Sequence, residues 1–119
     1  MDAPCDMFCS FRLEETFPLA EALKGALASH GISLFVCAVP AGESIAKQIA
    51  HNLMECKMAL ILGSETYGKD TKSSFSTYRE LTVIMDEKKP FFLVKTCAEF
   101  GKLYEVFPAF YNFILSIGD

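Results

Sequence analysis

The chain has 119 residues, of which 51% are hydrophobic and 22% are charged. This balance is typical of one packed domain and excludes a disordered chain. The formal net charge of −4 argues against binding of nucleic acid through a broad, positively charged surface. No stretch approaches the roughly 18 apolar residues that a membrane-spanning helix needs, and the start MDAPCDMFCSF lacks the basic region of a signal peptide. We therefore expect a cytoplasmic domain with neither nucleic acid nor membrane as a partner.

Cysteine and histidine usage gives no sign of a metal centre. The five cysteines are odd in number, form no CxxC pair and lie in or beside apolar runs: Cys5, Cys9, Cys37, Cys56 and Cys97. This pattern predicts reduced, mostly buried thiols. Neither His30 nor His51 has a ligand spacing to a cysteine, so we expect no zinc site.

The first half of the chain predicts a strand, a helix and a second strand. The apolar run at residues 5–10 (CDMFCS) indicates a strand that is covered on both faces. A helix is expected over 16–30, capped by Thr16, with Pro18 tolerated in its first turn and Gly31 stopping it. The next strand is expected over 32–37 (ISLFVC).

The second half repeats this alternation. A helix is expected over 43–56, where apolar residues recur every three or four positions, and a strand over 58–62 (MALIL). A further amphipathic helix is expected over 77–88, and Pro90 then leads into a strand over 91–94 (FFLV). The resulting β-α-β-α-β-α-β order predicts an α/β fold, a parallel sheet with helices on both faces.

The tail at residues 98–119 is harder to assign. Its first part suggests a short helix, and FYNFIL suggests a fifth strand. We expect a single domain over 1–119 that is shortened at its C-terminus, because no covering helix follows that strand.

Ligands of such sheets bind beyond the carboxyl ends of the strands, which excludes several familiar nucleotide sites here. The turn after the first strand, residues 10–14, holds no glycine, so neither a dinucleotide fingerprint nor a P-loop is present. An acidic cluster typical of a phospho-receiver domain is missing from the same turn. The nearest approach to a serine nucleophile elbow, residues 63–65 (GSE), lacks the second glycine.

Three stretches in order resemble the TIR (Toll/interleukin-1 receptor/resistance protein) family. They are residues 7–12 (MFCSFR), 40–45 (PAGESI) and 73–81 (SSFSTYREL), and the strand at 89–94 (KPFFLV) also fits. The likeness runs from about residue 5 to 115, with Ser76-Thr77 where the family usually has Trp-Cys. The resemblance implies a flavodoxin-like fold with a five-stranded parallel sheet.

The resemblance implies two kinds of function. Some TIR domains are non-enzymatic scaffolds that self-associate in innate immune signalling, and others hydrolyse or cyclise NAD+ at the nicotinamide–ribose bond. In the enzymatic kind the functional carboxylate precedes the leucine of the third motif, which is Glu80 here. We expect an NAD+ nucleosidase with no cofactor besides its NAD+ substrate, self-associating through residues 38–44. A domain that only senses a nucleotide is a third possibility.

One carboxylate suits this reaction. Glycosidases generally use two carboxyl groups because the leaving oxygen must be protonated. The nicotinamide of NAD+ is already cationic and leaves as a neutral base, so one ionised Glu80 can stabilise charge on the ribose. A helix starting near Thr77 would place Glu80 in its first turn, where the helix dipole favours the ionised form.

The other expected substrate-binding residues come from the same three stretches: Ser10, Phe11, Arg12, Gly42, Ser74 and Phe75. Arg12 can meet the pyrophosphate, Phe11 can stack on a base, and the hydroxyls of Ser10 and Ser74 can bind ribose or phosphate.

Structural interpretations remain open for several of these residues. Thr77 and Glu80 match a capping box that would turn the carboxylate back onto its own helix. Arg12 can instead pair with Glu14 or Glu15, and Phe11 can be a core residue. The turn at residues 67–70 (YGKD) is interpreted as solvated.

Overall fold

The computed structural model describes residues 3–37, 43–68 and 76–97. The elements in chain order are β1 (Met7–Ser10), α1 (Leu13–Ala28), β2 (Leu34–Phe35), α2 (Glu43–Glu55), β3 (Met58–Gly63), α3 (Thr77–Asp86) and β4 (Phe91–Lys95). All seven elements that the sequence predicts between residues 5 and 94 are therefore present. The tail with its expected helix and fifth strand lies outside the described residues.

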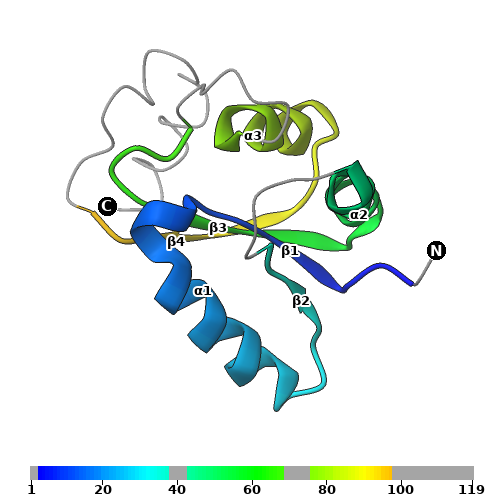
Figure 1. Cartoon of the computed structure of the whole chain (residues 1–119), viewed down its shortest axis with the longest axis horizontal. Helices are drawn as coiled ribbons and strands as arrows, with labels where there is room; N and C mark the ends of the chain where they lie inside the picture. Colours follow the sequence, from blue (N-terminus) through cyan, green and yellow to red (C-terminus); the bar gives the residue numbers. More distant parts are fainter. Residues whose placement is uncertain (1–2, 38–42, 69–75, 98–119) are drawn as a thin grey trace.

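The strands form a parallel sheet in the order β2-β1-β3-β4. Helix α1 covers one face, and α2 and α3 cover the other (Figure 1). The predicted α/β sheet with helices on both faces is thereby confirmed. The direction of strand addition reverses between β1 and β3, and a doubly wound sheet opens a crevice at this point, beyond the carboxyl ends of the strands.

The alternation of side chains along the strands divides the interior into two apolar clusters. The cluster under α2 and α3 contains Phe8, Ile49, Leu53, Cys56, Ala59, Ile61, Tyr67, Leu81 and Ile84. The cluster under α1 contains Cys9, Ala20, Leu34, Leu60 and Leu62. Since Phe8 faces α2 and α3 and Cys9 faces α1, Ser10 points to the same side as Phe8.

Helix α1 starts earlier than the sequence predicts. It begins at Leu13, and Thr16 lies inside it with non-helical angles, φ −131° and ψ 18°. The Thr16 hydroxyl donates to the Arg12 carbonyl and does not cap a helix, so the predicted cap is wrong. Helix α1 is kinked at Thr16, where two helical segments join. Pro18 lies in the first turn after this kink, where its missing N–H removes no hydrogen bond that the second segment needs.

Gly31 ends α1 as expected. It has a φ of +77°, and two hydrogen bonds close the turn, from Gly31 N to the Ala28 carbonyl and from Ile32 N to the Leu27 carbonyl, both 3.0 Å. This pair of bonds defines a Schellman motif, which favours glycine at the left-handed position.

We expect Gly31→Ala to destabilise the fold by about 1 kcal/mol, because an L side chain is strained at that positive φ. No heavy atom lies within 4 Å of the added Cβ, so the cost is conformational. Gly25→Ala is the matched control: Gly25 lies within α1, also in open space, and its substitution should stabilise by roughly 0.5–1 kcal/mol. Urea denaturation measures both. Equal effects of the two substitutions would contradict the assignment.

Candidate functional site

A buried chain of three polar groups lies beyond the carboxyl end of β1. Ser10, the last residue of β1, is 0% exposed, and its hydroxyl donates to Glu80 Oε1 at 2.8 Å. The same Ser10 Oγ lies 2.6 Å from Tyr67 Oη. The structure therefore joins two of the sequence-predicted site residues, Ser10 and Glu80, at the point where the strand order reverses.

The start of α3 frees Glu80 for this contact. The helix begins at Thr77, but its N-cap is Ser76, whose hydroxyl accepts from Arg79 N at 3.4 Å. Thr77 Oγ1 instead accepts from Gly68 N at 2.8 Å. The capping box of Thr77 and Glu80 is therefore wrong. Ser76 caps the helix, and the Thr77 side chain bonds the backbone of the preceding loop at Gly68.

Tyr67 is a site residue that the sequence interpretation missed. It was expected in a solvated turn, yet it is 2% exposed and packs into the cluster under α2 and α3. Its hydroxyl meets Ser10, which satisfies both buried groups. The available signal was its position after β3, at the same sheet edge as the end of β1.

Burial sets the electrostatics of the site. Desolvation raises the pKa of Glu80 to about 8, and the Ser10 hydrogen bond opposes this shift. Although Glu80 is half-buried as a residue, its carboxyl group is withdrawn from water. Burial thus shifts the carboxyl group toward its protonated form, opposite to the direction that the helix dipole favours. Burial, followed by the Glu80 charge, also raises the pKa of Cys9 to about 12.

A small cavity of about 180 Å³ touches Glu80 between α2 and α3. Its lining is mostly apolar and comprises Ile49, Ala50, Leu53, Met54, Arg79, Glu80 and Val83. Glu80 is thus one of the residues that line this space, and the lining residues that α2 contributes carry no charge.

Arg12 and Phe11 lie at the start of α1. Arg12 Nη2 is 3.5 Å from Glu14 Oε2, the pairing that the sequence left open. Its Nε is buried and has no hydrogen-bond partner among the described residues. Phe11 stacks on Phe17, with ring centroids 6.4 Å apart, and packs against the cluster under α1, which favours its core interpretation. The predicted binding residues Gly42, Ser74 and Phe75 lie outside the described residues.

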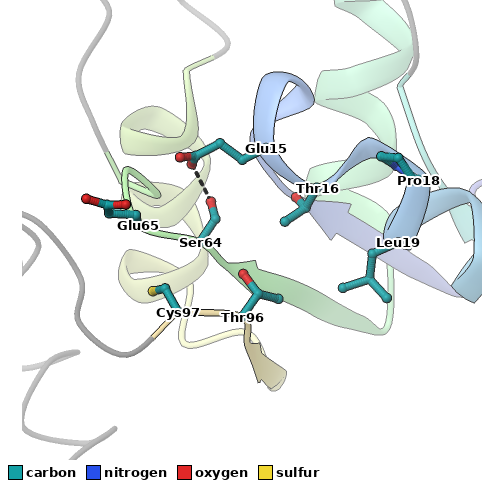
Figure 2. A pocket seen from close by; sticks show the side chains of 8 residues that line it. All are labelled: Glu15, Thr16, Pro18, Leu19, Ser64, Glu65, Thr96 and Cys97. Atoms are coloured by element: carbon teal, nitrogen blue, oxygen red, sulfur yellow. Dashed lines mark hydrogen bonds between the residues drawn. The ribbon is translucent and has the colours of Figure 1, made fainter.

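A second cavity, of about 460 Å³, lies between α1 and the segments that follow β3 and β4 (Figure 2). It is lined by Glu15, Thr16, Pro18, Leu19, Ser64, Glu65, Thr96 and Cys97. Glu15 Oε1 accepts from Ser64 Oγ at 2.6 Å, Thr66 Oγ1 at 2.7 Å and Thr66 N at 3.2 Å. The pKa of Glu15 is lowered: partial burial raises it, but these hydrogen bonds together outweigh that effect.

Within residues 3–37, 43–68 and 76–97, no group of three or more His, Cys, Asp or Glu side chains is arranged to hold a metal ion. No helix in these ranges is long and apolar enough to cross a membrane.

Comparison with solved structures assigns the architecture to the TIR-like folds. The chain is similar to the TIR domains in the activated Roq1 resistosome directly recognizing the pathogen effector XopQ. The TM-score is 0.65 and the sequence identity 24%, over 93% of this chain and 73% of that chain. No protein-family model matches the sequence, and no curated protein matches it either. The chain thus has the TIR fold that its sequence motifs resemble.

We expect Glu80→Gln to flatten the pH dependence of stability. Since the folded-state pKa of about 8 lies above the ordinary value of 4.5, folding favours protonated Glu80. Its stabilisation is complete below pH 4.5 and is lost as pH rises through about 8, at up to about 1.4 kcal/mol per pH unit. Denaturant unfolding across this range measures the slope. Exposed Glu87→Gln is the control, and a Glu80→Gln slope equal to that of the wild type would contradict the burial of this carboxyl group.

Proposed function

We propose that this domain cleaves the nicotinamide–ribose bond of NAD+, with Glu80 as the catalytic residue. The observation that carries the proposal is the direction of the Glu80 side chain. It meets Ser10 at the carboxyl edge of the sheet and does not fold back onto the amides of its own helix. A carboxyl group beyond the carboxyl end of β1, near the point where the strand order reverses, supports the proposal, because α/β sheets bind nucleotides in that region.

The raised pKa suits a cationic substrate. Only ionised Glu80 can stabilise the positive charge that develops on the ribose C1 as neutral nicotinamide leaves. The positive nicotinamide ring beside the carboxyl group would lower its pKa and favour that form. Substrate binding and ionisation of Glu80 thus assist each other.

Arg12 supplies a complementary charge for the pyrophosphate. Its present partner, Glu14, is exposed and 3.5 Å away, so the pair is weak and the guanidinium can exchange it for a phosphate oxygen. The buried Nε, which has no hydrogen-bond partner within the described part of the chain, is a further donor. Ser10 meets Glu80 directly, and Gly42, Ser74 and Phe75 complete the proposed substrate set.

The proposal extends to the setting of the reaction. We place the domain, residues 1–119, in the cytoplasm and in immune or cell-death signalling, with self-association through residues 38–44 promoting turnover. The product is ADP-ribose or a cyclic isomer. The TIR-like fold supports this setting, since the similar chain is part of a resistosome.

We expect Glu80→Gln to lower NAD+ turnover by about 10²–10³-fold, because an amide cannot supply the negative charge. Chromatography of nicotinamide and ADP-ribose products from concentrated protein measures the loss. Glu87→Gln, which removes an exposed carboxylate near the end of α3, should retain activity. Undiminished turnover by a folded Glu80→Gln protein would refute the catalytic role.

The second candidate is a non-enzymatic TIR scaffold. Two observations favour it: the cavity at Glu80 has about 180 Å³, below the roughly 300 Å³ typical of small-molecule sites, and a pKa of about 8 leaves the carboxyl group mostly protonated at neutral pH. This function predicts self-association without nicotinamide release at any protein concentration, with substitutions in residues 38–44 abolishing association and Glu80→Gln leaving it intact. Nicotinamide release by the wild type but not by Glu80→Gln would exclude it.

A further inference from the structure

The proposed reaction makes no use of the Tyr67 hydroxyl, although the fold brings it to the site. Tyr67 is 2% exposed, and its Oη lies 2.6 Å from the Oγ of Ser10, which is fully buried. Ser10 in turn donates to Glu80 at 2.8 Å. A buried hydroxyl without a hydrogen-bond partner would cost stability, and Ser10 provides the partner of Tyr67. Because Ser10 also contacts Glu80, the Tyr67–Ser10 contact can influence the carboxyl group.

We propose that Tyr67 is a positioning residue for Glu80 and acts through Ser10. The Ser10 hydroxyl has a single proton. When that proton points at the Glu80 carboxylate, the Tyr67 proton must fill the Tyr67–Ser10 contact, which fixes the order Tyr67 to Ser10 to Glu80. The catalytic meaning of this order rests on the proposed function, while the order itself does not.

The chain of donors strengthens the bond that meets the carboxylate. A hydroxyl that accepts a hydrogen bond becomes a better donor, and such polarisation is largest away from water. Tyr67 therefore favours ionised Glu80 without touching it. Without the tyrosine hydroxyl, Ser10 loses its fixed partner and stabilises the charge less.

The loop that carries Tyr67 is anchored to helices on both sides of the sheet. Gly68 N donates to Thr77 Oγ1 on α3, and Ser64 and Thr66 donate to Glu15 on α1. Figure 2 shows the Ser64–Glu15 bond. The Tyr67 N–H closes the turn onto the Ser64 carbonyl at 3.1 Å. These contacts hold the phenol at a set distance from Ser10.

The surroundings leave Tyr67 a neutral donor. Burial is the main cause that raises the pKa of Tyr67, the charges of Glu80 and Cys9 add to it, and the Ser10 hydrogen bond opposes it. From α2 the cavity beside Glu80 is lined by apolar Ile49, Ala50, Leu53 and Met54, and α3 adds Arg79 and Val83. Glu80 is accordingly the group of this cluster that titrates near neutral pH.

The test is the titration of the Glu80 side-chain carbon by NMR, assigned with Glu80→Gln. Tyr67→Phe keeps the ring and should raise the midpoint by about 0.5–1 pH unit, the size of one hydrogen bond. Ser10→Ala should raise it at least as much, and the double variant no further than Ser10→Ala alone. Thr82→Val, which removes a hydroxyl that donates to the Tyr78 carbonyl on α3, should leave the midpoint unchanged.

Activity provides the second readout. The wild-type kcat/KM should rise with pH to a plateau above about 8, because ionised Glu80 is the active form. Tyr67→Phe should shift the rising part of the kcat/KM profile to higher pH by the same amount as the NMR midpoint of Glu80. The plateau value of kcat/KM should stay unchanged. A purely structural tyrosine would move neither.

The outcomes separate the two proposals. An unchanged titration midpoint in Tyr67→Phe, or additive shifts in the double variant, would overturn the positioning role. If Tyr67→Phe shifts the midpoint and the wild-type protein releases no nicotinamide, the positioning role is supported and the nucleosidase activity is refuted.

Discussion

The hydrogen bond between Ser10 and Glu80 is the constraint on which the site depends. It joins the end of a central strand to the first turn of α3, across a sequence separation of 70 residues. A carboxyl group withdrawn from water must find a donor, and Ser10 is the donor that the strand presents on that face. The same burial that makes the bond necessary raises the pKa of Glu80 to about 8.

The parallel sheet makes this contact possible. Strands β1 and β3 are neighbours, paired from Met7–Met58 to Ser10–Ile61, so their carboxyl ends open at one edge. The connections from these strands lead to opposite faces, α1 to one and α3 to the other. The β3–α3 loop between them is held by Glu15 on one side and Thr77 on the other. The loop can therefore carry a buried tyrosine at an edge that would otherwise be open.

Much of this arrangement could be predicted from residue patterns. Apolar runs, helical spacing and the turn-forming residues Gly31 and Pro90 located the elements. Strand β2 is shorter than the predicted 32–37 and spans Leu34–Phe35. The motif resemblance assigned Glu80 and Ser10 to one site, with Ser10 expected to bind substrate, and the structure adds the hydrogen bond between them. These features depend on local sequence or on the order of elements, which a single chain displays.

The sequence by itself determined the alternation of strands and helices, the parallel sheet and the position of Glu80 in the first turn of α3. Only the tertiary structure decided where the Glu80 side chain points, since Ser76 and Thr77 were both able to cap and their choice depends on the neighbouring loop. It also decided that Tyr67 is buried and that Glu80 is desolvated. Burial and hydrogen-bond partners arise from residues distant in sequence, and no local pattern records them.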